Sequence, residues 1–249
     1  PVPRVGVFTD TFEEINGVSH TWQRLAKLAR RTGRRLTVVT CSTDPVRPPG
    51  DADVRYFQPV AAYPLPEYPE QKLYIPPLLE MMEFCYERGF THLHAATPGP
   101  LGLAALAIAR VMKLPFSTTY HTAVPQYARV LTGDTAVEDL AWRLILWFYD
   151  QSEVVFSSSV ASAEELMAKG VAPAKVRIMP RGVDTEVFSP ETRTARILLE
   201  ADYRMKLIGI GKLDGGRNIP DYFQLLKQSG QSSGGKPLEA LRWWLTLRH

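Results

Sequence analysis

The stretch Arg181-Gly182-Val183-Asp184-Thr185-Glu186-Val187-Phe188-Ser189-Pro190 decides how the fold of this chain is interpreted. It follows a short apolar run that ends at Pro180, and Gly182 supplies a tight bend. Phe188 then anchors an extended strap, and a second apolar run begins at Lys206. A strand, an extended strap and a second strand indicate a connection between two domains. The alternative is an ordinary solvent loop that contains a glycine and two prolines.

Upstream of this connection, short apolar runs alternate with amphipathic stretches. Continuously apolar strands that are each followed by a helix are typical of a parallel sheet covered on both faces. Residues 1–185 are therefore predicted to form a doubly wound α/β domain. The expected strands are Val5–Phe8, Leu36–Thr40, Val54–Phe57, Thr91–Ala95, Phe116–Tyr120, Val154–Phe156 and Val176–Met179. The expected helices are about Val18–Thr32, Pro76–Arg88, Leu101–Met112, Ala161–Lys169 and Val137–Tyr149, the last with Leu140, Leu144 and Trp147 on one face.

Two regions give weaker patterns. The proline-rich Pro45–Pro69 is expected to be a long loop around one short strand. Residues 186–205 are expected to be an interdomain linker, and residues 206–249 the start of a second domain. That start offers one strand (Lys206–Ile210) and one helix (Ile219–Lys227), which bury too little surface to form a domain. We therefore expect the second domain to be incomplete.

The composition limits the class of protein. The apolar fraction is 45% and the charged fraction 22%, as in globular proteins, and the net charge of +3 does not favour a nucleic-acid partner. The longest apolar stretch, Leu101–Ala109, is far shorter than the roughly 20 residues of a spanning helix. No signal peptide is expected. The two cysteines, Cys41 and Cys85, are expected to be buried free thiols, and the chain to be cytoplasmic.

Ligands of doubly wound sheets bind outside the carboxyl ends of the strands. That rule selects the loops Thr9–Gly17, Ala96–Gly99 and Tyr120–Thr122, because each follows an expected strand. In the first loop, the free N–H groups and the dipole of a helix start favour an anion near Gly17. The alternative for this loop is a simple turn with an Asn16-Gly17 bend, and for Ala96–Gly99 it is a proline-initiated helix start.

A histidine lies in the third loop, and two cations lie in the expected second domain. His121 could donate a hydrogen bond to a sugar hydroxyl or to developing charge, although a lone histidine is often structural. The loop Ile210–Asn218 carries Lys212 and Arg217, which could neutralise a diphosphate. Two solvated loop cations are the alternative.

These segments together resemble glycosyltransferase family 4. The strap is similar to the family's G-V-D-x-x-x-F-x-P, and Thr9-Asp10-Thr11-Phe12 with Asn16-Gly17-Val18 resembles the segment beside the sugar diphosphate. Tyr120-His121-Thr122 is similar to the family's sugar-contacting site. The loop with Lys212 and Arg217 resembles G-R-L…K-N with the two cations exchanged.

The resemblance implies a GT-B architecture of two Rossmann-like domains, and the retaining transfer of mannose or glucose from a nucleotide diphosphate sugar. GDP-mannose or UDP-glucose would be the donor, and a lipid or glycan the acceptor, with no metal or other cofactor. It also implies His121 as the catalytic residue that holds the transferred sugar. Gly17, Asn16, Lys212 and Arg217 would bind the donor, and Asp10 and Thr122 the acceptor.

The family's glutamate–seven residues–glutamate motif has no counterpart after Asn218, where Glu239 is the only glutamate. A competing hypothesis is therefore a truncated, non-catalytic half that keeps the fold and at most binds acceptor. A nicotinamide-dependent oxidoreductase is a third class. It is disfavoured because Thr9-Asp10-Thr11, rather than glycines, follows the first strand.

Two further side-chain groups remain. His92 and His94 alternate along a buried strand and are expected to face opposite sides, so no metal site is expected there. A basic run lies on and just after the first helix; its members are Arg24, Lys27, Arg30, Arg31, Arg34 and Arg35. It is either a solvated helix face or a peripheral contact with anionic lipid headgroups of a membrane.

Overall fold

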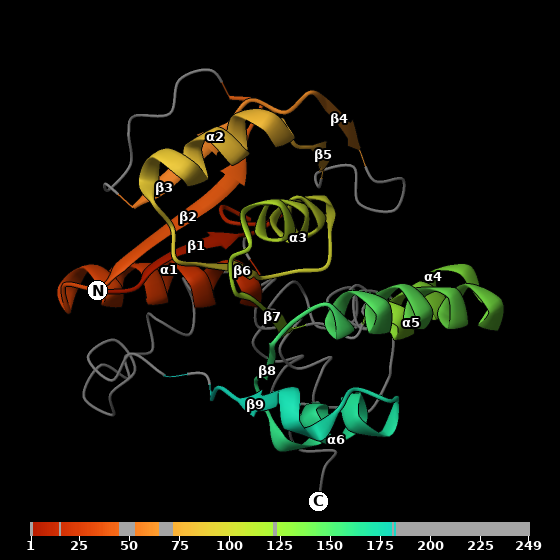
Figure 1. Cartoon of the computed structure of the whole chain (residues 1–249). Helices are drawn as coiled ribbons and strands as arrows, with labels where there is room; N and C mark the ends of the chain where they lie inside the picture. The colour runs from red at the N-terminus through yellow and green to blue at the C-terminus, as the bar shows by residue number, and fades with distance from the viewer. Residues whose placement is uncertain are drawn as a thin grey trace, which may run out of the picture. The chain divides into compact units, whose positions relative to one another are not determined.

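The fold was obtained as a computed structural model, which describes residues 2–14, 16–44, 53–64, 72–121, 124–180 and 182. The chain divides into two units, Pro1–Gly182 and Val183–His249. The description concerns the first, whose helices and strands are labelled in Figure 1. The expected linker and the expected second domain lie outside the described residues. So do Thr122, Lys212 and Arg217.

Seven parallel strands form the main sheet, as the apolar runs predict. They are β1 (Arg4–Phe8), β2 (Arg35–Cys41), β3 (Val54–Phe57), β6 (His92–Ala95), β7 (Phe116–Tyr120), β8 (Val154–Ser157) and β9 (Val176–Ile178). Their order in space is β3-β2-β1-β6-β7-β8-β9. The chain runs outward from β1 to β3 and then returns to β6 on the other side of β1. The switch point of the topology, where such sheets bind ligands, therefore lies between the ends of β1 and β6.

Helices cover both faces of the sheet, which confirms the doubly wound α/β fold. On one face, Val7 and Val38 pack with Trp22 of α1 (Gly17–Arg31). On the other face, Phe8 and Val39 belong to a core shared with α2 (Leu78–Arg88) and α3 (Pro100–Met112). Neighbouring strand residues thus point to opposite helical layers, because successive side chains of a strand alternate.

The proline-rich region holds more structure than a long loop around one strand. A second, antiparallel sheet joins β4 (Ala61–Pro64) to β5 (Lys72–Ile75). Its strands are short and mostly exposed, so they carry no apolar run that a sequence pattern would detect. The prediction of a single strand in Pro45–Pro69 was therefore wrong.

The helical part after β7 also differs from the expectation. The sequence predicted no helix over α4 (Val124–Thr132), which pairs with α5 (Thr135–Asp150). Leu140, Leu144 and Trp147 share one face of α5, as predicted, but that face is exposed. The buried face carries Trp142, Ile145, Phe148 and Tyr149. The last helix, α6 (Val160–Ala168), and a 3-10 turn (Pro173–Lys175) lead into β9.

Two remaining expectations concern prolines and cysteines. Pro100 occupies the first turn of α3, where its missing N–H costs nothing. The helix expected to begin at Pro76 begins instead at Leu78, so Pro76 and Pro77 lie before it. Cys41 and Cys85 are buried free thiols, as predicted, and burial raises the pKa of each to about 12. Among the described helices, none is long and apolar enough to cross a membrane.

Candidate functional site

Asp10 bridges the two strand ends at the switch point. Its carboxylate accepts a hydrogen bond from the Thr97 hydroxyl (2.6 Å) and another from the Leu101 N–H (2.9 Å). Leu101 lies in the first turn of α3, so Asp10 caps that helix from the loop after β1, about 90 residues away in sequence. A Cβ atom at Gly99 would lie 2.3 Å from Asp10 Oδ2, so the carboxylate also needs glycine at that position.

The capping contact defines the chemistry of Asp10. Burial raises the pKa of its carboxyl above the ordinary value; the hydrogen bonds from Leu101 and Thr97 oppose this rise, and the nearby charge of Glu14 adds to it. Both carboxylate oxygens already serve the fold. An acceptor contact by Asp10 therefore stays a prediction, and it would have to coexist with the cap.

The start of α1 is closed by a capping box. Asn16 Oδ1 accepts hydrogen bonds from the Val18 and Ser19 N–H groups, each at 2.9 Å, and the Asn16 N–H lies 3.4 Å from Ser19 Oγ. Two of the N–H groups expected to face a donor phosphate are therefore used by Asn16. The N–H of Gly17, which is exposed, has no partner within the described residues and remains available to an anion.

His121 lies beside the same helix. Its ring packs edge-on against Trp22, with ring centroids 6.2 Å apart. Trp22 is five residues from Gly17, or about 7.5 Å along the helix axis. Because β1 and β7 are parallel, His121 and the α1 start also share the carboxyl edge of the sheet. The structure thus brings Asn16, Gly17 and His121 to one edge.

A buried polar chain lies next to these side chains. Ser117 Oγ lies 2.7 Å from His92 Nε2 and 2.8 Å from His94 Nδ1, and His94 Nε2 lies 2.9 Å from Thr119 Oγ1. The expectation that His92 and His94 face opposite sides was wrong, because residues i and i+2 of a strand share a face. Trp22 covers His94 as well, with ring centroids 4.8 Å apart.

A neutral His94 satisfies the polar chain. One nitrogen of a neutral imidazole donates and the other accepts, so the hydroxyls of Ser117 and Thr119 complete one directed chain. Burial, together with the charges of His121 and His92, lowers the pKa of His94 to about 3. His94 is therefore a neutral support beneath Trp22 at neutral pH. Sequence patterns missed it, because the strand was taken to turn it away from its neighbour.

On the opposite face of β7, Glu165 joins three elements. It accepts hydrogen bonds from the Tyr120 hydroxyl (3.2 Å) and from the Gln126 amide, and thus ties β7 and α4 to α6. Burial raises the pKa of the Tyr120 hydroxyl, and the adjacent Glu165 carboxylate raises it further. Nothing in the sequence singled out Glu165, because its partners lie about 40 residues away.

Beside Asp10, the ends of β1 and β2 enclose a small cavity of about 50 Å³. Glu13, Glu14 and Cys41 are among its lining residues, and Tyr56 donates a hydrogen bond to Glu13 (2.5 Å). Burial raises the pKa of Glu14. In the part of the chain that the structure describes, no group of three or more metal-ligating side chains is present.

Profiles of two protein families match this chain. The profile of Glycosyltransferase Family 4 matches residues 15–187, and that of a protein family of unknown function matches residues 166–222. A GDP-mannose-dependent alpha-mannosyltransferase of Mycobacterium tuberculosis is 29% identical over 198 residues, which are 76% of this chain and 50% of that protein. A sulfoquinovosyl transferase of Arabidopsis thaliana is 26% identical over 197 residues, 77% of this chain and 37% of that protein.

The fold is also that of a solved structure. Sucrose-phosphate synthase from Thermosynechococcus elongatus superposes with a TM-score of 0.53 and 16% identity, over 80% of this chain and 53% of that one. This chain therefore spans about half the length, or less, of the relatives that it matches.

Proposed function

Since this chain belongs to glycosyltransferase family 4, we propose that its described domain forms the acceptor side of a retaining hexosyltransferase site. In this proposal the carboxyl edge around the α1 start and His121 holds the acceptor and contacts the transferred hexose. The remaining donor contacts come from the second domain. The reaction needs no metal, because protein cations and N–H groups neutralise the leaving diphosphate.

One observation carries the proposal furthest. His121 and the helix that starts at Gly17 are joined through Trp22, so a hydrogen-bonding imidazole and an exposed helix start lie at one sheet edge. A hexose with a diphosphate presents hydroxyl groups to the first and an anion to the second. Preorganised groups of this kind stabilise the charge that develops in a transition state.

Each predicted residue has a role that its chemistry supports. His121 donates a hydrogen bond to a hydroxyl of the transferred hexose. The Gly17 N–H faces the diphosphate, and Asn16 keeps the α1 start in shape. Lys212 and Arg217 supply positive charge to the diphosphate, and Thr122 with Asp10 faces the acceptor.

The donor and the acceptor are proposed as classes. GDP-mannose is favoured by the named donor of the mycobacterial relative, and UDP-glucose is the second candidate. The acceptor is a lipid or a glycan. We place the protein in the cytoplasm, in peripheral contact with the cytoplasmic face of a membrane when the acceptor is a lipid.

In isolation, this 249-residue chain is expected to bind donors weakly and to transfer little or no sugar. The glutamate pair that grips sugar and ribose in the family has no counterpart after Asn218. Each lost hydrogen bond to a charged or polar donor group costs roughly 1.5–3 kcal/mol, so affinity falls by orders of magnitude.

The test is calorimetric titration of the chain with GDP-mannose, UDP-glucose, GDP and UDP, together with a donor-hydrolysis assay. We expect a dissociation constant on the order of millimolar for one of the two sugar donors, and no turnover. His121→Ala should weaken that binding at least several-fold. Tyr86→Ala, an exposed aromatic on α2, is the matched control and should change nothing.

Two results would contradict this account. Equal donor binding by the wild type and by His121→Ala would remove His121 from the site. Micromolar donor binding, or turnover that His121→Ala abolishes, would show that the chain itself holds a complete catalytic site.

A further inference from the structure

A second hollow lies at the opposite, amino edge of the sheet. It has a volume of about 490 Å³, and Arg4, Arg34, Arg35 and Arg88 line it together with Asp53 and Glu87. The four arginines come from β1, from the turn after α1, from β2 and from the end of α2. None of them belongs to the carboxyl-edge site, because the strands run away from this edge.

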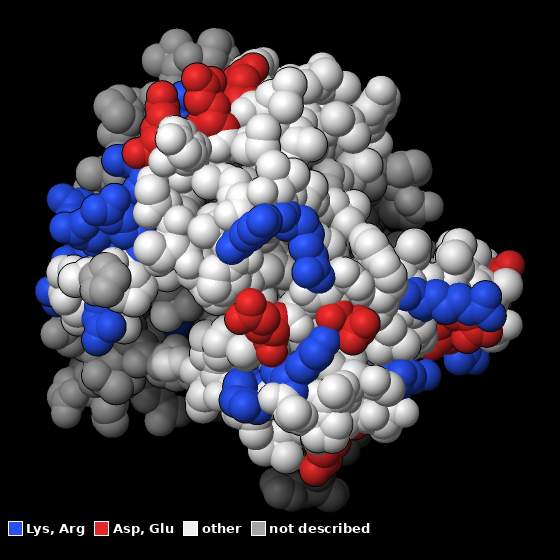
Figure 2. Space-filling view, in the orientation of Figure 1, with Lys and Arg blue, Asp and Glu red and all other residues white. Residues whose placement is uncertain are grey.

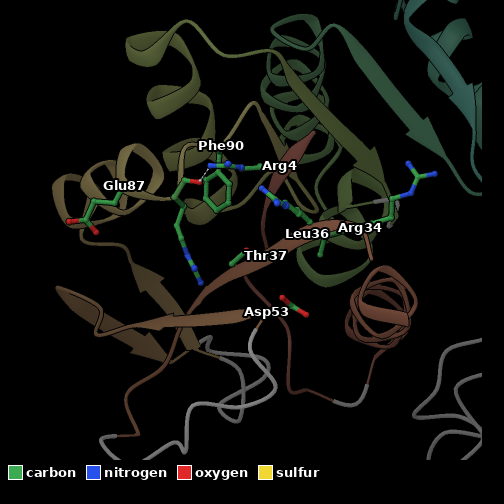
Figure 3. A pocket seen from close by; sticks show the side chains of 9 residues that line it. Arg4, Arg34, Leu36, Thr37, Asp53, Glu87 and Phe90 are labelled. Carbon is green, nitrogen blue, oxygen red and sulfur yellow. Dashed lines mark hydrogen bonds between the residues drawn. The ribbon is translucent and has the colours of Figure 1, made fainter. Parts of the chain in front are cut away.

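The backbone fixes the positions of these arginines. Arg4 and Arg35 are direct neighbours in the register of β1 and β2, so their side chains leave the same face of the sheet side by side. Arg4 Nη1 donates a hydrogen bond to the Arg88 carbonyl (3.3 Å), at the end of α2. Figure 3 shows Arg4 lying along Phe90, with this bond as a dashed line and Arg34 at the other rim. The pocket floor is therefore built, while the charged ends are exposed.

Among the described residues that line this pocket, the four arginines outnumber the two carboxylates of Asp53 and Glu87. Within the described residues, none of the four arginines forms an ion pair with Asp53 or Glu87. Arg88 instead lies over the Phe84 ring, 5.3 Å from its centroid, and Arg55 lies over the same ring at 5.6 Å. Figure 2 shows Lys and Arg side chains gathered near the N-terminus of the chain, with a group of acidic side chains next to them.

The juxtaposition of Arg4 and Arg35 is unfavourable in the free protein. Like charges directly opposite on neighbouring strands are destabilising. Attraction to a helix C-terminus accounts for Arg88, at the last residue of α2, and for the hydrogen bond of Arg4. It does not account for Arg35, which has no described partner, or for a hollow between them.

We propose that this amino-edge pocket binds a phosphoryl group of a multiply charged anion, either a soluble phosphate compound or a lipid headgroup. The planar guanidinium group holds phosphate oxygens in pairs, which makes arginine the preferred residue for such anions. The volume lies within the range of small-ligand sites. A bound anion would also relieve the repulsion between Arg4 and Arg35. This site is separate from the proposed sugar site and does not depend on it.

The test is an NMR titration of the labelled chain with inorganic pyrophosphate and with inorganic phosphate, at constant ionic strength. We expect the amide signals of Thr37 and Gly89 to shift in a saturable way, and pyrophosphate to bind more tightly than phosphate. Arg35→Gln should weaken pyrophosphate binding at least ten-fold. Arg143→Gln, at an exposed position of α5, removes the same charge elsewhere and should leave the affinity unchanged.

Vesicle sedimentation distinguishes the two sources of the phosphoryl group. Binding to phosphatidylglycerol vesicles but not to phosphatidylcholine vesicles, lost in Arg35→Gln, assigns the pocket to a lipid headgroup. Pyrophosphate binding without vesicle binding assigns it to a soluble ligand. The proposal is overturned if the chain binds neither pyrophosphate nor phosphatidylglycerol vesicles. It is also overturned if Arg35→Gln and Arg143→Gln bind pyrophosphate and these vesicles equally. The amide spectrum of each variant shows whether the fold is intact.

Discussion

The free energy of unfolding should fall by about 4 kcal/mol between pH 6.5 and pH 3 because of His94 alone. In the folded chain burial lowers the pKa of His94 to about 3, whereas an unfolded histidine titrates near 6.5. Between these two pKa values, His94 binds a proton in the unfolded chain but not in the folded chain. The stabilisation is therefore fully present above pH 6.5 and is lost as the pH falls toward 3.

The measurement is urea unfolding of the wild type and of His94→Gln at pH 7, 6, 5 and 4. The stability difference between the two should shrink by up to about 1.4 kcal/mol per pH unit below 6.5. Comparing the slopes of stability against pH removes the cost of losing the hydrogen bonds to Ser117 and Thr119, because that cost is the same at every pH. Burial also raises the pKa of Asp10 and of Glu14, so each contributes stability that is lost as the pH rises. Both residues are present in the wild type and in the variant, so their effect cancels in the comparison.

His92→Gln is the matched control. His92 bonds the same serine but is only half-buried, and burial lowers the pKa of this histidine while the nearby charge of Glu153 opposes that shift. This variant should therefore change the slope less than His94→Gln does. Parallel pH profiles for the wild type and His94→Gln would show that His94 is accessible to protons, against the buried polar chain described above.

Gly102→Ala should destabilise the domain by at least about 2 kcal/mol. On propensity alone, alanine in place of a helical glycine would stabilise by about 1 kcal/mol. Here the added Cβ would lie 2.0 Å from the Thr97 carbonyl oxygen and 3.3 Å from Phe148. Thr97 cannot withdraw freely, because its hydroxyl is bonded to Asp10. The clash therefore outweighs the gain in helix propensity.

Chemical unfolding at neutral pH measures this change. Leu103→Ala, at the neighbouring and partly exposed position of α3, is the control and should cost less than Gly102→Ala. Wild-type or higher stability of Gly102→Ala would mean that α3 is not held against the Ala96–Gly99 loop in the way the structure shows. The loop would then be a poor support for a site at the switch point.

Much of the fold was predictable because its strands are continuous apolar runs. The central strands β1, β2, β6 and β7 were placed within one or two residues by this pattern. The β4–β5 sheet was missed because its side chains are largely exposed, and exposure leaves no apolar signature. The exposed face of α5 was recognised as a face, but periodicity alone does not say which face of a helix is buried.

The candidate site was less predictable, because its contacts join distant segments. The rule that ligands bind at carboxyl strand ends selected the loops of Asp10 and His121. It did not reveal that Asp10 caps α3 or that Trp22 touches both His94 and His121. Those contacts depend on tertiary packing between residues up to about 100 positions apart. The capping box at Asn16 is local, but the sequence suggested free N–H groups there instead.

The central claim is that the carboxyl edge around Gly17 and His121 is the sugar-binding site. NMR chemical-shift mapping with GDP-mannose and UDP-glucose at millimolar concentration tests it most directly. The account predicts saturable shifts of the Gly17 and His121 amide signals, and a several-fold loss of affinity in His121→Ala. Shifts absent from this edge, or unchanged affinity in His121→Ala, would contradict it.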